Sequence, residues 1–291
     1  MSVAIITDSN SGITQSQARE IGIAVVPMPF YINDEVYYED ITMSQEEFYG
    51  YLKQDVDVKT SQPTPENLFK YWDEALETHD EVVYIPMSSG LSSSTHTAML
   101  LAEDDKYKGK VFVVDNQRIS VSQRQASLDA FELAKKGFDG TQIKDIMLRD
   151  KMESSIYIML DTLYYLKKGG RITPAAAAIG TLLKIKPVLQ IQGEKLDAYT
   201  KAKTLKSGKL AMIKAVKKDM AERFGDPTGG NCHLAIAHTS SPEDVEQFRA
   251  EVNEEFQDHF LQIDPLSLSV ACHIGPGSLA LAVTKKTEEL L

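Results

Sequence analysis

The sequence has few cysteines and no long apolar segment. Its 291 residues include only two cysteines, Cys232 and Cys272. Two are too few for a disulfide framework, so we expect buried thiols in a reduced, cytoplasmic protein. The longest weakly polar run, residues 172–183, is mostly alanine and is shorter than the ~20 residues that span a bilayer. The first residues lack the basic and apolar regions of a signal peptide. These absences argue against secreted, disulfide-rich and membrane-spanning classes.

Positive charge is also scarce. The 31 Lys and Arg residues are outnumbered by 42 Asp and Glu residues, which gives a formal net charge of −11. Such a balance argues against a protein that binds nucleic acid through a broad basic face. One local basic segment, Lys201–Lys218, stands out against this acidic background. We therefore expect no nucleic-acid partner.

The common nucleotide and metal motifs are absent from the sequence. It contains no Gly-x-x-x-x-Gly-Lys-Ser/Thr loop, which disfavours a P-loop kinase. It has neither Cys-x-x-Cys nor His-Glu-x-x-His, so no zinc site is indicated. We expect no bound metal and no resident cofactor.

The length favours two domains, because a domain commonly takes ~100–200 residues. In the first half, short β-branched runs alternate with helical patterns, which predicts a mostly parallel sheet covered on both faces. In the second half, strand-like runs at residues 185–192 and 196–203 flank Gly193-Glu194-Lys195, a hairpin signal. We expect an N-terminal α/β domain over residues 1–153 and a C-terminal α+β domain with a mixed sheet over residues 154–291.

Several local signals fix where helices begin and end. Ser44 stands three residues before Glu47, the spacing of a capping box. Thr14 precedes another helical pattern, and Pro65 suits the first turn of a third helix. The pair Gly169-Gly170 should stop a short helix that precedes it.

Hydroxyl-rich loops follow the predicted strands. They occupy Thr7–Ser11, Thr60–Thr64 and Ser88–Thr95, and a fourth segment, His273–Ser278, precedes the last strand. Ligands of open α/β sheets bind at the carboxyl ends of the strands, and helix N-termini there attract anions. For any single loop, capping and turn chemistry is the better explanation. Several such loops together favour an oxyanion site for a carboxylate or a phosphate.

Asp8, at the end of the first predicted strand, admits two interpretations. It is placed to hold Mg²⁺ or to accept a phosphoryl group, but a haloacid-dehalogenase-like site would have a second Asp where this chain has Asn10. We therefore expect Asp8 to orient the neighbouring loop.

A serine hydrolase is the alternative enzyme class. The segment Gly90-Leu91-Ser92-Ser93-Ser94 follows a predicted strand but lacks the second glycine of a nucleophile elbow. Ser92, Asp115 and His273 would supply the three members of a catalytic triad in that chain order. Since a defining glycine is missing, this hypothesis is the weaker one.

Six ordered blocks resemble the DegV family over essentially the whole chain. The blocks are Thr7-Asp8-Ser9, Thr60-Ser61-Gln62-Pro63, Ser88-Ser89-Gly90-Leu91-Ser92, Leu166-Lys167-Lys168-Gly169-Gly170-Arg171-Ile172, Lys186-Pro187 and His273-Ile274-Gly275-Pro276-Gly277. Similar members are bacterial fatty-acid-binding proteins that carry the acyl chain for a two-part fatty acid kinase. The resemblance implies a long-chain fatty acid as ligand and the ATP-binding kinase subunit as partner, with ATP and Mg²⁺ on that partner. The acyl phosphate product would enter phospholipid synthesis.

The resemblance also implies roles for particular residues, none of them catalytic. Thr60 and Ser92 would contact the fatty acid carboxylate, with Ser61 nearby and His273-Ile274-Gly275 closing the carboxylate end. Arg171 and Lys203 would dock the kinase, and transient contact with a membrane surface is compatible with this function.

Three departures from the family pattern stand near these positions. Lys203 replaces the usual Arg and so loses a bidentate fork. Ser93 replaces a glycine beside the expected carboxylate site, where it would restrict the loop or add a donor. Gln123-Arg124-Gln125 stands where small residues are expected.

Energetics make the implied mechanism reasonable. Burial of an acyl chain contributes ~0.8 kcal/mol per CH₂, whereas each charge-assisted hydrogen bond contributes roughly 1.5–3 kcal/mol at most. We therefore expect the tail to set affinity and Thr60 and Ser92 to set orientation. A sensor that binds lipid without passing it to a kinase is the third hypothesis.

Overall fold

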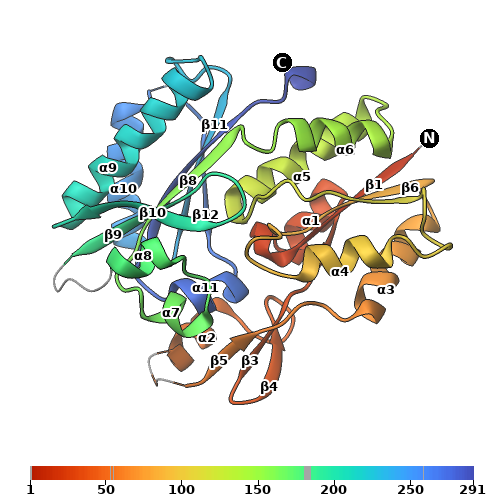
Figure 1. Cartoon of the computed structure of the whole chain (residues 1–291), viewed down its shortest axis with the longest axis horizontal. Helices are drawn as coiled ribbons and strands as arrows, with labels where there is room; N and C mark the ends of the chain where they lie inside the picture. Colours follow the sequence, from red (N-terminus) through yellow and green to blue (C-terminus); the bar gives the residue numbers. More distant parts are fainter. Residues whose placement is uncertain (1, 53, 55, 180–184, 258) are drawn as a thin grey trace. The chain divides into compact units, whose positions relative to one another are not determined.

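The computed structural model describes residues 2–52, 54, 56–179, 185–257 and 259–291. The chain forms two units (Figure 1). Unit 1 comprises Met1–Lys151, Ser267–Ser269 and Thr287–Leu291, and unit 2 comprises Met152–Leu266 and Val270–Lys286. The sequence suggested one boundary, between residues 153 and 154, and gave no signal for the two short later segments of unit 1.

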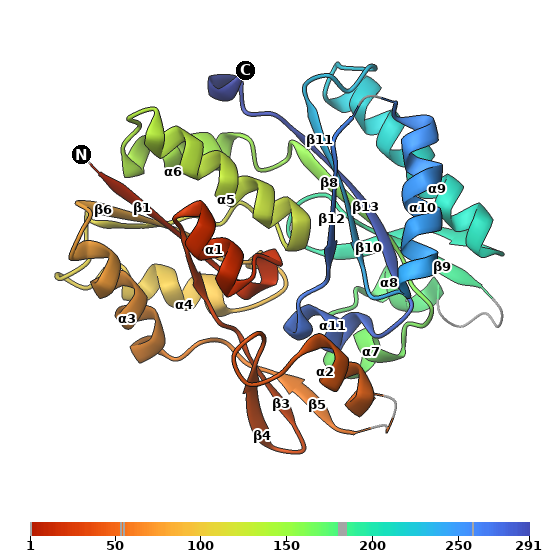
Figure 2. The same ribbon diagram turned by 180° about the vertical axis from the view of Figure 1, so that it is seen from behind.

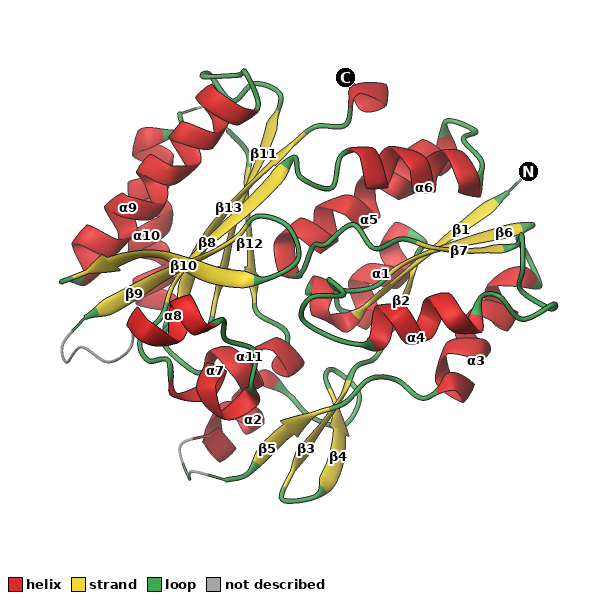
Figure 3. Cartoon of the chain, viewed as in Figure 1, coloured by secondary structure: helices red, strands yellow, loops and turns green. Residues whose placement is uncertain are grey.

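The elements of unit 1 alternate between strands and helices in its parallel part (Figure 3). Its strands are β1 (Val3–Asp8), β2 (Ala24–Val26), β3 (Pro29–Ile32), β4 (Glu35–Tyr38), β5 (Val58–Thr60), β6 (Glu81–Ile85) and β7 (Val111–Val113). Its helices are α1 (Gln15–Ile21), α2 (Gln45–Leu52), α3 (Pro65–Leu76), α4 (Ser94–Leu101), α5 (Ser120–Lys135) and α6 (Gly140–Arg149), with 3-10 turns at Ser9–Ser11 and Glu288–Leu290.

Unit 1 is built on a parallel sheet, as predicted. The strand order is β2-β1-β6-β7, and Ile6 of β1 pairs with Ala24 of β2 and Tyr84 of β6. Successive residues of a strand point to opposite faces. Ile5 packs against α1, α5 and α6, whereas Ile6 packs against α3 and α4. Both faces of this sheet are therefore covered.

The second sheet of unit 1 is antiparallel, with the order β4-β3-β5. Asn33 and Asp34 form the turn between β3 and β4, and their φ values of 49° and 68° are the left-handed pair of a two-residue hairpin. Thr60 closes β5 and pairs with Phe30. The sequence indicated a loop from Thr60 onward because β5 is only three residues long and alternates weakly.

The predicted helix starts are also confirmed. Thr14 and Gln17 each accept the other's backbone N–H at 3.1 Å. Ser44 and Glu47 form the second capping box, in which Glu47 accepts the Ser44 N–H at 2.9 Å. Pro65 is the first residue of α3.

Unit 2 contains the second group of elements. Its strands are β8 (Ser154–Met159), β9 (Lys186–Ile191), β10 (Leu196–Ala202), β11 (Cys232–His238), β12 (Leu261–Pro265) and β13 (Leu279–Lys285). Its helices are α7 (Tyr164–Gly169), α8 (Pro174–Ile179), α9 (Leu205–Lys218), α10 (Pro242–Glu255) and α11 (Leu268–Ile274, whose first two residues belong to unit 1), with a π-helical turn at Asp219–Arg223.

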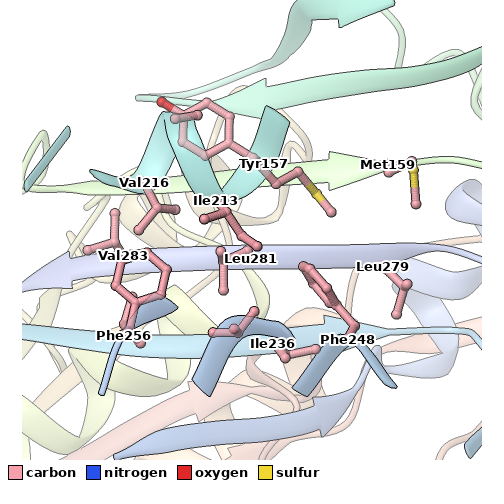
Figure 4. Packing of buried hydrophobic residues seen from close by; sticks show 14 of the residues in the cluster. Tyr157, Met159, Ile213, Val216, Ile236, Phe248, Phe256, Leu279, Leu281 and Val283 are labelled. Carbon is pink, nitrogen blue, oxygen red and sulfur yellow. The ribbon is translucent and has the colours of Figure 1, made fainter. Parts of the chain in front are cut away.

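The expected mixed sheet of unit 2 is confirmed. Its order is β10-β9-β8-β13-β11-β12, with only the β11–β12 pair parallel among the strands described. The predicted hairpin is β9–β10. Helices α9 and α10 lie side by side on one face (Figure 2). Figure 4 shows their apolar residues, such as Ile213 and Phe248, packed against Ile236, Leu281 and Tyr157 of the sheet.

One lysine of the basic segment 201–218 is not part of an exposed surface. Lys209 is buried, its Nζ lies 3.2 Å from Glu251 Oε1 of α10, and it stands 5.6 Å from the Phe248 ring centroid. This lysine therefore joins α9 to α10.

Two elements of unit 2 carried too little pattern to be predicted. β12 is a short edge strand that ends at a proline. α11 is nearly all apolar, so it shows no amphipathic period, and the expectation of a loop at His273 and Ile274 is wrong because both belong to its last turn.

The described ranges contain no helix that is long and apolar enough to cross a membrane. The alanine-rich run 172–183 forms α8 in part, and its residues 180–183 lie outside the described residues. Cys232 and Cys272 are both buried, and neither forms a disulfide, as expected.

Candidate functional site

The strand order of unit 1 places a topological switch point between β1 and β6. The chain moves from β1 outward to β2, and later from β6 outward to β7 on the opposite side. In open α/β sheets, the crevice for ligands lies outside the carboxyl ends of the two strands at such a point. The loops after β1 and β6 are two of the hydroxyl-rich segments found in the sequence.

Asp8 joins these two loops. Its Oδ1 accepts the Asn10 N–H and its Oδ2 accepts the Met87 N–H, both at 2.9 Å. The side chain is fully buried, and burial raises its pKa above the ordinary range against the lowering effect of these bonds. The expectation that Asp8 orients the neighbouring loop is confirmed.

Gln123 of α5 completes this buried polar group. Its amide donates to Asp8 Oδ1 and to Thr7 Oγ1, each at 3.1 Å. Thr7 in turn donates to the Ile85 carbonyl at 2.8 Å. The unusual Gln at this position therefore supports the ends of β1 and β6.

The loop after β6 folds around Ser88. The Ser88 carbonyl accepts the backbone N–H of Leu91 and of Ser92, at 3.0 and 3.2 Å, and its hydroxyl accepts the Gly90 N–H at 3.3 Å. Ser92 Oγ accepts the Ser94 N–H at 3.2 Å. Ser92 thus sits in a turn that its own hydroxyl helps to close, immediately before α4.

Gln62 brings the loop that follows β5 to the start of α4. Its side-chain oxygen accepts from Ser93 Oγ at 3.3 Å and from Thr97 Oγ1 at 3.1 Å. Thr60 and Ser61 directly precede Gln62, and Ser92 directly precedes Ser93. The structure therefore brings two predicted site segments of unit 1 together. Two effects were expected of Ser93, a restricted loop or an added donor, and its hydroxyl does act as a donor, to Gln62.

Ser94 is a candidate site residue that the sequence did not single out. Its side chain is buried at the first residue of α4, and its hydroxyl has no partner within the described part of the chain. A buried hydroxyl without a partner is costly. No pattern distinguished Ser94 from the other hydroxyls of the run.

In unit 2, the predicted basic motif forms the end of α7. The Gly170 N–H donates to the Lys167 carbonyl and the Arg171 N–H donates to the Leu166 carbonyl, both at 3.2 Å. These are the two hydrogen bonds of a Schellman motif. Gly170 has φ 68°, a left-handed conformation that glycine adopts readily. Gly170 therefore ends the helix, as predicted for the glycine pair.

Gly169 has a different reason to be glycine. A Cβ built on it would overlap the imidazole of His273, lying 2.8 Å from Cε1 and 3.2 Å from Cγ. The Gly169 carbonyl also accepts from Arg171 Nη1 at 2.7 Å. The structure thus brings two predicted motifs of unit 2, the one at Arg171 and the one at His273, into contact.

Burial and the nearby Arg171 charge lower the pKa of His273 to about 4. A histidine with this pKa is neutral near pH 7, so it can donate a hydrogen bond without carrying charge.

The turn after α11 is held by Thr239. The Thr239 hydroxyl donates to the Gly275 carbonyl at 2.7 Å and accepts the Ser278 N–H at 2.9 Å. Gly275 and Gly277 have φ values of 75° and 81°, which explains both glycines. Thr239 lies 36 residues before Gly275 in the chain, so no local pattern pointed to it.

Lys203 is exposed in the turn between β10 and α9, and Arg171 is exposed beyond the end of α7. Thr204 next to Lys203 caps α9 by accepting the Ser207 N–H at 3.1 Å. Both cations are therefore accessible on unit 2.

The serine-hydrolase alternative finds no support in the described residues. Asp115 Oδ1 accepts the Ser89 N–H at 3.2 Å, so this carboxylate holds a loop, whereas a triad carboxylate orients the histidine. The low pKa of His273 also makes its imidazole a weak base near pH 7. In the same described ranges, no group of three His, Cys, Asp or Glu side chains is placed to hold a metal ion.

A family model described as "Uncharacterised protein, DegV family" matches residues 2–286. The chain belongs to the DegV family. A DegV domain-containing protein of Staphylococcus aureus is 29% identical over 282 residues, covering 97% of this chain and 98% of the relative. One of Deinococcus radiodurans is 30% identical over 288 residues, covering 97% and 98%. The family resemblance seen in the sequence is confirmed.

Solved DegV structures share the fold. A DegV family protein of Thermus thermophilus, described by its fatty acid binding, aligns with a TM-score of 0.87 and 27% identity over 98% of this chain and 100% of its own. DegV of Bacillus subtilis, described as a fatty acid binding protein, gives 0.86 and 25% over 98% and 100%. A stearic acid-binding protein of Eubacterium ventriosum gives 0.88 over 99% of each chain, and at 21% identity it supports the fold alone. The expected fold class, a mostly parallel α/β part followed by an α+β part with a mixed sheet, is confirmed.

Proposed function

We propose that this DegV protein binds one long-chain fatty acid and holds its carboxylate with uncharged donors. The observation that carries the proposal is the hydroxyl-lined switch point of unit 1, where Ser92 and the buried Ser94 stand at the start of α4. Hydroxyl donors and helix N-termini suit an anion. The descriptions of the Thermus and Bacillus relatives as fatty-acid-binding proteins support this ligand class.

Thr60, Ser61 and Ser92 are the proposed carboxylate contacts of unit 1, and Ser94 joins them because of its unpartnered hydroxyl among the described residues. The family resemblance implies carboxylate contacts for His273, Ile274 and Gly275 of unit 2 as well. Tail burial at ~0.8 kcal/mol per CH₂ supplies most of the affinity. The hydroxyls set the orientation of the carboxylate.

We propose further that the bound acid is presented to a separate ATP-dependent kinase, which phosphorylates it to an acyl phosphate in the cytoplasm. ATP and Mg²⁺ belong to that partner. Neutral hydroxyl donors suit this step, because they leave the carboxylate oxygen more nucleophilic than a guanidinium clamp would. The exposed Arg171 and Lys203 of unit 2 are the proposed docking cations.

Native mass spectrometry of the purified protein tests the ligand, and we expect one long-chain fatty acid per chain. The double variant Thr60→Ala, Ser92→Ala should bind a fluorescent fatty acid about tenfold or more weakly, since it removes two donors to a charged group. Thr78→Ala, which removes an exposed hydroxyl just after the end of α3, is the matched control. A wild-type protein without lipid and without saturable binding would exclude the fatty-acid proposal, and an unchanged double variant would exclude these contacts.

Arg171→Ala tests the docking assignment. We expect kcat/KM for acyl phosphate formation with the kinase subunit to fall about tenfold, while the fatty acid Kd at pH 7.5 stays within about twofold, because an ion pair at an interface contributes to association. Lys195→Ala is the control, since Lys195 is an exposed cation in the β9–β10 turn. A loss of lipid affinity at unchanged kinase turnover would contradict a docking role.

A further inference from the structure

The backbone conformation of Gly169 does not require a glycine. It is the last residue of α7, and its φ lies outside the left-handed region in which Gly170 is found. Alanine is therefore compatible with the Gly169 backbone. What excludes a side chain is the His273 imidazole, which occupies the position that a Cβ would take.

The same residue holds Arg171. The Gly169 carbonyl accepts from Arg171 Nη1 at 2.7 Å, and the arginine charge contributes to the low pKa of His273. One residue thus contacts the proposed docking cation through its carbonyl and the proposed head-group imidazole at its Cα.

In a second glycine–ring contact the roles are reversed, because α7 supplies the ring and the turn after α11 supplies the glycine. A Cβ on Gly275 would overlap the Tyr165 ring of α7, lying 2.9 Å from its Cγ. The helix α7 therefore offers a glycine to His273 and a ring to Gly275. Two such contacts resist both sliding and tilting of the turn that carries residues 273–275, because close-packed groups cannot move independently.

We propose that Gly169 is a positioning residue: it leaves space for the His273 ring and binds Arg171 through its carbonyl, so that these two side chains are fixed relative to each other. This inference rests on the proposed function, which gives His273 to the fatty acid head group and Arg171 to the kinase. It assigns Gly169 a role for which no direct contact with either ligand is needed.

Gly169→Ala is the direct test, with two readouts. In an NMR titration of the imidazole, the pKa of His273 should rise from about 4 to above roughly 5, because a displaced ring gains solvent. Fatty acid affinity should fall about tenfold. Arg171→Ala should also raise the pKa of His273, since it removes the charge, but without moving the ring.

The double variant Gly169→Ala, His273→Ala separates positioning from a general structural effect. If Gly169 acts through the ring, adding Gly169→Ala to His273→Ala should weaken fatty acid binding by less than about a further twofold, since the effects of coupled residues are not additive. Gly170→Ala is the control: it strains a left-handed residue, but a Cβ there meets nothing within 4 Å, so the pKa of His273 should stay unchanged.

An unchanged His273 pKa in Gly169→Ala, or fully additive affinity losses in the double variant, would overturn the proposal. The NMR readout needs no lipid. A wild-type protein that binds no fatty acid would therefore refute the proposed function while the seating of His273 by Gly169 is still tested.

Discussion

Asp8→Ala should lower the free energy of unfolding of unit 1 by about 3–5 kcal/mol. The carboxylate accepts from the Asn10 and Met87 backbone N–H groups and from the Gln123 amide. Each buried donor that loses its acceptor costs about 1–3 kcal/mol, and partial relaxation keeps the total below the sum. The side chain also fills space in a fully buried position, so a cavity adds to the loss.

Trp72 gives a probe that reports on unit 1. It is the single tryptophan of the chain, and it lies on α3 with its side chain fully buried against the parallel sheet. Urea titration followed by its fluorescence should show the midpoint of Asp8→Ala far below that of wild type, with Asp8→Asn between them because it keeps one acceptor oxygen. The exposed Asp105→Ala is the control. A loss of less than about 1 kcal/mol for Asp8→Ala would mean that the three donors find other partners.

Local signals predicted the parts of the fold that depend on neighbouring residues. The capping box at Ser44 and the helix start at Thr14 depend on residues three positions apart, and the structure has both. The parallel sheet followed from alternating strands and helices. Elements without a pattern, β5, β12 and α11, were missed because they are short or lack a polar face.

The sequence shows the residue types of the candidate site but not the contacts that support them. Hydroxyl loops are visible in the sequence, yet Gln123 contacts Asp8 across 115 residues and Thr239 holds Gly275 across 36. Such contacts are set by the tertiary fold, so composition and spacing carry no trace of them. The pair Gly169-Gly170 illustrates this. The pattern assigns both glycines to the helix stop, whereas a side chain at Gly169 is excluded by the imidazole of His273, which is distant in the sequence.

Glu39→Gln should stabilise unit 1 at alkaline pH by about 2–3 kcal/mol. Glu39 follows β4, and its carboxylate accepts the Leu268 N–H at 2.9 Å and the Gln45 amide at 2.7 Å. Burial, with a smaller contribution from Asp40, raises its pKa from 4.5 to about 7. Each pH unit of difference corresponds to about 1.36 kcal/mol, and the weaker hydrogen bonds of a neutral amide reduce the gain.

The sign of the pH dependence follows from proton binding. Between pH 4.5 and about 7, the folded protein keeps the Glu39 proton that the unfolded chain releases, so the free energy of unfolding falls as pH rises through this window. The stabilisation is complete below pH 4.5 and is lost above about pH 7. Because the amide introduced by Glu39→Gln cannot ionise, the difference between variant and wild type isolates this group from others that titrate nearby, such as Asp129 with a pKa of about 6.

Urea unfolding of both proteins, monitored by Trp72 fluorescence from about pH 5 to about pH 8.5, measures this difference directly. At the acidic end the two curves should nearly coincide, since the protonated carboxyl and the amide have similar shapes and both leave an oxygen for the Leu268 N–H. At the alkaline end the variant should be the more stable protein. A variant less stable than wild type at every pH would mean that the ionised carboxylate binds the Leu268 N–H strongly enough to offset its own burial.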